Sequence, residues 1–179
     1  LCADNLVFEC NLVEGIKRDE LVAFQYQGLK DLVDFAPIPW RNGKFDPEAL
    51  ATAIETNERA EQSLEAWREH GQGPTLGFCV SITHARFMAG YFADAGVRAV
   101  AVHSGEASAP RQASVDGLRT GAVEVIFTVD LFNEGLDVPE IETVLLLRPT
   151  ESPVIFLQQL GRGLRRAENK DCLRVVDFI

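Results

Sequence analysis

The chain has 179 residues, of which 46% are hydrophobic and 25% charged, the composition of a globular protein that can bury a core. No apolar run approaches the roughly 20 residues of a membrane span, so we expect no membrane partner. The 17 basic and 27 acidic residues give a net charge of −10. This charge argues against a domain that holds nucleic acid by bulk charge, but it leaves room for a local basic patch.

The cysteines and the first residues bear on the location and the completeness of the chain. The four cysteines, at positions 2, 10, 79 and 172, form no CxxC pair, and the three histidines are isolated. We therefore expect no metal site and a reducing cytoplasm as the location. The chain begins with Leu1 and shows no signal-peptide pattern, so we expect it to be a segment of a longer protein.

Residues 1–73 are expected to form strands, a linker and helices that pack on the domain that follows. Apolar runs at 6–12 and 21–29 predict two strands, and the stretch 35–48, rich in Pro, Gly and Asn, predicts a loop. Asp46-Pro47 is typical of a helix start, and a second helix is expected from about 57 to 70, ending at Gly71.

From residue 74 to residue 179 strands alternate with helices, which predicts an α/β domain with a mostly parallel sheet and helices on both faces. The expected strands are five apolar runs: TLGFCV, VRAVAV, VEVIFTV, ETVLLL and CLRVVDFI. Three helices are expected between them. One is capped by Thr83 and runs to about Ala95, one runs from Pro110 to near Gly121, and one opens at Ser152-Pro153.

Polar residues follow the expected strands, where parallel sheets bind their ligands. They are Ser81, Thr83 and His84 after the first strand; His103, Ser104 and Gly105 after the second; DLFNEGLDVPE, residues 130–140, after the third; and Arg148 after the fourth. The sequence therefore predicts one sheet edge that carries hydroxyls, carboxylates, glycines and arginine.

The expected last helix contains FLQQLGRGLRR, residues 156–166. At about 100° per residue, Gln158, Arg162 and Arg165 share one face and the leucines lie opposite. Glycine costs about 1 kcal/mol relative to alanine inside a helix, so its two glycines imply a close approach or a helix end. Guanidinium groups bind phosphate oxygens well, which predicts a phosphate site.

Each of these stretches has a simpler interpretation. The arginines of GRGLRR can be solvated, with the glycines marking only the helix end. Asn133-Glu134-Gly135 can be a turn, and Asp137 a loop carboxylate bonded to nearby amides. Taken alone, either stretch favours the simpler interpretation. Their expected position at one sheet edge favours a binding site.

Together these stretches resemble the second RecA-like domain of superfamily 2 helicases and translocases. LGFCVSITHARFMA resembles motif IV, the stretch from 102 to 149 resembles the segment through motif V, and QQLGRGLRR fits the QxxGRxxR pattern of motif VI. The resemblance is nearest to the restriction-enzyme-like and DEAD/DEAH-like branch, because Glu134 stands where RNA DEAD-box proteins usually have arginine.

The resemblance implies a role for each matching residue. Arg162 and Arg165 would be arginine fingers on the γ-phosphate of ATP, and Gln158 would order the nucleotide or the attacking water. Gly135 would let the backbone approach the nucleotide, and Asp137 would contact its ribose or orient an arginine. The implied contacts to nucleic-acid phosphates, with DNA favoured over RNA, are Ser81, Ser104, Thr128 and the amides near Gly105.

The chain lacks the other half of an ATP site. It contains no GxxxxGK[ST] loop, and Asp19-Glu20 does not follow an apolar strand as a magnesium-binding Walker B pair would. ATP and Mg²⁺ would therefore require an N-terminal motor domain of the same protein, and we expect the isolated chain to hydrolyse no ATP.

The resulting hypothesis is the C-terminal motor half of an ATP-dependent nucleic-acid helicase or translocase. Two alternatives remain open: a degenerate docking module without catalysis, and a stand-alone α/β enzyme that binds a nucleotide.

Overall fold

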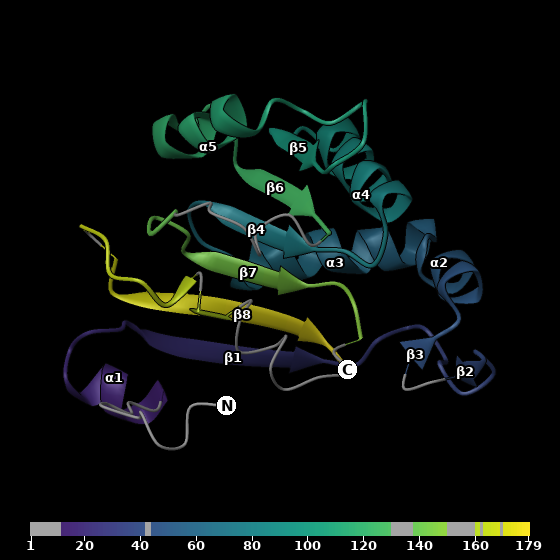
Figure 1. The fold of residues 1–179 in the computed structure, drawn as a ribbon, viewed down its shortest axis with the longest axis horizontal. Helices are drawn as coiled ribbons and strands as arrows, with labels where there is room; N and C mark the ends of the chain where they lie inside the picture. The colour runs from purple at the N-terminus through teal and green to yellow at the C-terminus, as the bar shows by residue number, and fades with distance from the viewer. Residues whose placement is uncertain (1–11, 42–43, 130–137, 150–159, 162, 169) are drawn as a thin grey trace, which may run out of the picture.

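A single six-stranded sheet forms the centre of the computed structural model, which describes residues 12–41, 44–129, 138–149, 160–161, 163–168 and 170–179 (Figure 1). All five strand pairings are parallel, in the order β1-β8-β7-β4-β6-β5. The strands are β1 (Ala23–Leu29), β4 (Thr75–Phe78), β5 (Ala99–Val102), β6 (Val125–Thr128), β7 (Thr143–Leu146) and β8 (Cys172–Phe178). The five expected strands after residue 74 are confirmed.

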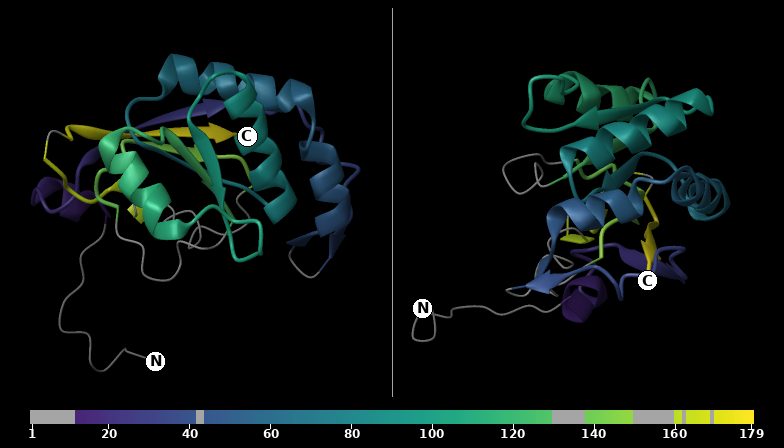
Figure 2. Two further views of the ribbon diagram at one scale, coloured as in Figure 1. Left: turned by 90° about the horizontal axis from the view of Figure 1, so that it is seen from above. Right: turned by 90° about the vertical axis from the view of Figure 1, so that its right-hand side faces the viewer.

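Helices cover both faces of the sheet, as predicted (Figure 2). Helices α3 (Asn57–His70) and α4 (Ile82–Asp94) lie on one face, where Leu64, Met88 and Phe92 pack with strand residues such as Phe127. Helix α5 (Arg111–Thr120) covers the other face through Val115 and Leu118. Two apolar cores therefore lie above and below the sheet.

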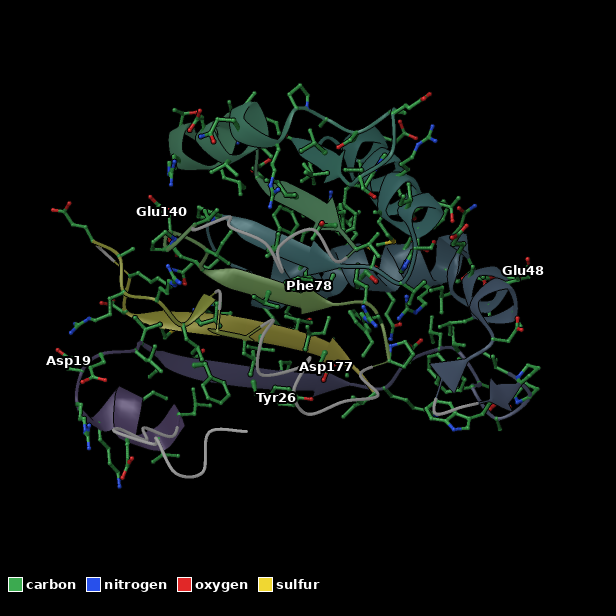
Figure 3. All side chains as sticks on the ribbon, viewed as in Figure 1. Asp19, Tyr26, Glu48, Phe78, Glu140 and Asp177 are labelled. Carbon is green, nitrogen blue, oxygen red and sulfur yellow. The ribbon has the colours of Figure 1, made fainter. Side chains whose placement is uncertain are left out.

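The segment before residue 74 contributes to this same sheet. The run expected as a strand at 21–29 contains β1, which pairs along its whole length with β8 at the edge of the sheet. Tyr26 on β1 also donates a hydrogen bond of 2.6 Å to Asp177 on β8 (Figure 3). Most of the run 6–12 lies outside the described residues, and Leu12 begins a short helix, α1 (Leu12–Lys17).

The prediction of a loop at 35–48 is wrong in part. This stretch contains a small antiparallel hairpin of β2 (Trp40–Arg41) and β3 (Lys44–Phe45), followed by helix α2 (Pro47–Ile54). Strands of two residues are too short to show the alternation by which strands are recognised in a sequence. The helix starts at Asp46-Pro47 and near 57 are confirmed.

The N-cap of helix α4 is Ser81, whereas the sequence predicted Thr83. The Ser81 Oγ accepts a hydrogen bond of 3.0 Å from the backbone N–H of His84, which satisfies a donor of the first turn. The helix expected after Ser152-Pro153 lies largely outside the described residues. Leu160, Gly161 and Gly163 are helical and belong to its last turn.

A buried ion pair fixes α3 to the sheet. Arg59, 1% exposed, donates from Nη2 to Asp31 Oδ2 at 2.8 Å and to the Leu147 carbonyl at 3.1 Å, and its Nε lies 3.1 Å from both carboxylate oxygens. Asp31 follows β1, and Leu147 follows β7. One guanidinium therefore joins α3 to the ends of two strands.

We expect Asp31→Asn to lower the free energy of unfolding by about 3–5 kcal/mol, because it leaves the buried Arg59 charge without its partner. Urea unfolding measures this loss. The matched control is Asp34→Asn, since both carboxylates accept a backbone N–H two residues on, at 2.9 and 3.0 Å, but Asp34 is exposed. Equal losses in the two variants would show that the ion pair does not hold α3.

Candidate nucleotide and nucleic-acid site

The described candidate residues lie at two opposite edges of the sheet. Ser81, Ser104 and Thr128 follow or end strands β4, β5 and β6, so they lie at the carboxyl edge. Arg165 forms a backbone bridge with Leu21, which precedes β1, and therefore lies at the amino edge. The sequence predicted GRGLRR at the carboxyl edge. This is incorrect for Arg165, because a helix that follows a parallel strand returns across the sheet and ends at its far side.

Four predicted residues, Gln158, Arg162, Gly135 and Asp137, lie outside the described residues. Their roles stay predictions.

A carboxylate is hydrogen-bonded to the two hydroxyl side chains that follow β4. Glu55, at the end of α2, accepts hydrogen bonds from Ser81 Oγ at 3.2 Å and Thr83 Oγ1 at 2.8 Å. The two hydroxyl oxygens lie 2.8 Å apart. A hydroxyl has one proton, so while both donate to Glu55 neither can donate to a phosphate oxygen. No sequence pattern indicated this contact, because Glu55 lies 26 positions before Ser81 and 28 positions before Thr83.

His84, next in this segment, is a neutral structural residue. It is fully buried, and burial followed by the nearby Arg59 charge lowers its pKa to about 3. Its Nδ1 accepts a long hydrogen bond of 3.4 Å from the backbone N–H of Val80. His84 therefore serves the fold as a hydrogen-bonding residue and is not suited to acid or base catalysis at neutral pH, because burial lowers its pKa.

The loop after β5 is organised around His103. The Gly105 N–H donates to His103 Nδ1 at 3.0 Å, and the His103 N–H donates to Ser108 Oγ at 2.9 Å. A Cβ at Gly105 would lie 3.1 Å from that ring nitrogen, so the loop is closely packed there. Ser104 is exposed, and its hydroxyl is the accessible one in this loop for a phosphate contact.

Thr128 lies deeper than its predicted role requires. It is the last residue of β6, paired in register with Phe78 on β4 and Val102 on β5, and it is fully buried. Within the described ranges its hydroxyl has no hydrogen-bond partner. A phosphate would reach Thr128 only after neighbouring residues move.

The two glycines of GRGLRR have different surroundings. A Cβ at Gly163 would lie 2.5 Å from the Leu173 side chain on β8, so this glycine lets the helix pack closely on the sheet. A Cβ at Gly161 would meet nothing within 4 Å in the described part of the chain. Leu160 and Leu164 are buried, whereas Arg165 is exposed. The leucines therefore anchor the helix end, as predicted.

Lys170 fixes the backbone at this helix end. It is 8% exposed, and its Nζ donates to the carbonyls of Gly163 at 2.6 Å, Arg165 at 3.1 Å and Pro139 at 2.8 Å. One ammonium thus joins the end of motif VI to the end of the motif V stretch. No sequence signal pointed to Lys170, which stands in the polar connection before β8.

The side chain of Arg166, the neighbour of Arg165, binds a segment near the start of the chain. Its Nη1 donates to the Asp19 carbonyl at 2.7 Å and forms an ion pair with the Asp19 carboxylate. Arg165 and Arg166 are both exposed. Arg166 therefore joins the chain after motif VI to the turn before β1.

We expect Lys170→Met to lower the free energy of unfolding by about 1–3 kcal/mol at pH 7, because buried carbonyls lose their donor. The effect should depend on pH. Burial lowers the Lys170 pKa from 10.5 to about 8, against the opposing effect of Glu142 and Glu140. The folded chain thus releases the proton near pH 8 and the unfolded chain near 10.5, so folding is favoured as pH rises between these values.

The measurement is urea unfolding of the wild type and of Lys170→Met at several pH values from 7 to about 10.5. The wild type should gain stability relative to the variant across the upper part of this interval. Lys30→Met, at an exposed lysine, is the control and should show no such trend. If the difference in free energy of unfolding between wild type and Lys170→Met stayed the same at every pH, the lowered pKa of a buried Lys170 would be contradicted.

Two further observations concern the described residues. No described helix has the length and apolar character of a membrane span. In the same residues, no group of three or more His, Cys, Asp and Glu side chains is placed to hold a metal ion.

Residues 55–167 match the family model described as the helicase conserved C-terminal domain. The chain belongs to this family. The matched residues run from Glu55, at the end of α2, to just beyond GRGLRR, and so include all the predicted site residues. The resemblance to the second RecA-like domain of superfamily 2 helicases is confirmed.

Similar proteins agree with this assignment. IRC3 of Saccharomyces cerevisiae, an ATP-dependent helicase by name, is 28% identical over 180 residues, which cover 98% of this chain and 26% of IRC3. The type ISP restriction-modification enzyme LlaBIII, solved bound to DNA, matches 99% of this chain and 14% of its own with a TM-score of 0.65 and 17% identity. The E. coli DEAD-box protein SrmB matches 88% of this chain and 77% of its own with a TM-score of 0.59 and 15% identity.

These likenesses confirm the RecA-like α/β fold. The chain spans 26% to 36% of the length of the first three curated relatives that it matches. It is thus similar to one part of each of these longer proteins.

Proposed function

We propose that this helicase C-terminal domain is the second motor half of an ATP-dependent nucleic-acid helicase or translocase. The observation that carries the proposal is the arrangement around motif VI. Buried Leu160 and Leu164 anchor the helix end, Lys170 fixes its carbonyls, and Arg165 lies exposed directly beyond it. A guanidinium on so constrained a backbone is well placed to act on a partner's nucleotide.

In this proposal ATP is the substrate, bound between this chain and an N-terminal RecA-like domain of the same protein. That domain supplies the phosphate loop and the ligands of Mg²⁺, which neutralises phosphate charge when bound. Arg162 and Arg165 stabilise the charge that develops on the γ-phosphate, and Gln158 orders the attacking water. Gly135 and Asp137 contact the nucleotide. Closure of the two domains brings the arginines to the phosphate, and hydrolysis releases them.

The nucleic-acid strand is proposed to follow the carboxyl edge. Ser104 and the amides near Gly105 contact its phosphates. Ser81 does so once its proton is released from Glu55, and Thr128 once neighbouring residues move aside. Such contacts position the protein on the backbone without reading bases. We favour DNA over RNA because the motifs resemble the restriction-enzyme-like branch.

We expect Arg165→Ala to lower kcat for ATP by at least about a hundredfold in the longer protein that contains this chain, since an arginine finger is worth about 10³–10⁵ in related NTPases. Nucleotide affinity should change little, because the finger acts mainly in the transition state. Steady-state ATPase assays and a nucleotide-binding titration measure the two quantities.

The matched control is Arg166→Ala, at an adjacent exposed arginine that is bound to Asp19. This variant should keep kcat within a few-fold of wild type. Near-normal turnover by Arg165→Ala would overturn the finger assignment. ATP hydrolysis by the 179-residue chain alone would instead support the stand-alone enzyme.

We expect Glu55→Gln to tighten nucleic-acid binding about two- to fivefold, the scale of an exposed charge interaction. The change removes a negative charge that repels phosphate and weakens the acceptor that holds the Ser81 and Thr83 protons. Fluorescence anisotropy with labelled single-stranded DNA and RNA measures the affinity.

Glu48→Gln is the control, because Glu48 is an exposed carboxylate at the other end of the same helix α2 (Figure 3). It should alter the affinity little. Weaker binding by Glu55→Gln would contradict the idea that Glu55 competes with phosphate for the hydroxyl protons. It would mean that Glu55 holds Ser81 in its binding position.

A further inference from the structure

Lys170 uses all the donors of its ammonium group on carbonyls around motif VI. An ammonium has three N–H donors, and those of Lys170 reach the carbonyls of Gly163 at 2.6 Å, Arg165 at 3.1 Å and Pro139 at 2.8 Å. The first two lie at the end of a helix, where the last carbonyls lack partners within the helix and a cation is favoured. Lys170 therefore binds the backbone of the proposed arginine finger itself.

The carbonyl between these two is bonded as well. The Val22 N–H, just before β1, donates to the Leu164 carbonyl at 2.9 Å, and Leu21 forms an antiparallel backbone bridge with Arg165. The three consecutive carbonyls of residues 163–165 are thus all bonded from outside the helix. Lys170 supplies its two bonds from a side chain, so a substitution can remove them and leave the Val22 bond in place.

The third bond of Lys170 reaches the segment that resembles motif V. Pro139 stands two positions after Asp137 and four after Gly135, the two residues proposed to contact the nucleotide. One ammonium therefore holds the backbone after these residues close to the backbone of Arg165. A shift of either backbone relative to the other must break a hydrogen bond of a buried cation, which is costly.

Burial distinguishes Lys170 from the other cation at this helix end. Lys170 is 8% exposed, so water competes little for its donors. The Arg166–Asp19 ion pair is open to solvent, with side chains 53% and 76% exposed, and pairs of this kind contribute little. We therefore expect the position of the finger to depend on Lys170 and hardly on Arg166.

We propose that Lys170 is a positioning residue for the arginine finger, which it holds in a fixed position relative to the motif V stretch. This inference rests on the proposed function, because it assumes that Arg165 acts on ATP. Lys170 touches no reacting atom and acts through Arg165. Misplacing a catalytic group by about 1 Å can cost roughly a hundredfold in rate, so loss of the ammonium lowers kcat even in a folded chain.

The test is a double-mutant cycle on ATP turnover, with Lys170→Met and Arg165→Ala in the longer protein that contains this chain. Lys170→Met alone should lower kcat about ten- to a hundredfold and leave KM for ATP within about threefold of wild type. In the Arg165→Ala background the same substitution should lower kcat by less than about twofold, because the finger that it positions is already absent. Turnover is counted per folded molecule, with the folded fraction taken from circular dichroism at the assay temperature.

Chemical rescue tests the N–H donors directly. A hollow of about 260 Å³ lies against Lys170, and it gives a small amine access to the space that Lys170→Ala vacates. Ethylammonium should restore part of the kcat that this variant loses. Tetramethylammonium, which has the same charge and no N–H donor, should not do so at equal ionic strength.

Lys30→Met, at an exposed lysine, is the matched control and should keep the wild-type kcat. If Lys170→Met does not fold, Lys170→Gln, which keeps two N–H donors, takes its place in the cycle. An equal fold-loss of kcat in the two backgrounds, no loss in either, or equal rescue by the two cations would overturn the positioning role and leave the motor function intact. Near-normal turnover by Arg165→Ala would overturn both.

Discussion

The arrangement of this domain depends on one constraint: all six strands of its sheet run in the same direction. Each connection between neighbouring parallel strands must therefore return across a face of the sheet, and this places the ends of strands and the ends of helices at opposite edges. The hydroxyls of Ser81, Ser104 and Thr128 lie at one edge because they end or follow strands. Arg165 lies at the other because it follows a helix. Two chemically distinct surfaces on one small domain are thus a consequence of its topology.

Two buried cations stabilise these edges in similar ways. Arg59 binds Asp31 and the Leu147 carbonyl near the carboxyl edge, and Lys170 binds three carbonyls near the amino edge. Burying a charge is costly, but a cation can satisfy several acceptors that come from different segments. Each cation joins segments distant in sequence and so fixes the backbone from which the candidate residues project.

The sequence predicted the parts of the fold that depend on local patterns. Apolar runs identified the strands after residue 74, and Asp46-Pro47 identified the start of α2, because both signals lie within a few residues. The β2–β3 hairpin was not predicted, because two-residue strands carry no periodicity. The contacts of Glu55 and Lys170 were not predicted either, since they join residues that only the tertiary fold brings together. Periodicity also placed the leucines of motif VI correctly, but it could not show at which edge the helix ends.

The acidic character of the chain is compatible with nucleic-acid binding because the proposed contacts need little net charge. Hydroxyl and amide donors bind phosphate oxygens without adding positive charge. Glu55 lowers the availability of two of these hydroxyls, so under the proposed function this domain would make only weak contact with a strand. A translocating domain must release its strand in every cycle, and weak contacts allow that release. Tight holding would then fall to the partner domain or to the closed, ATP-bound arrangement, which makes the affinity for nucleic acid depend on the nucleotide.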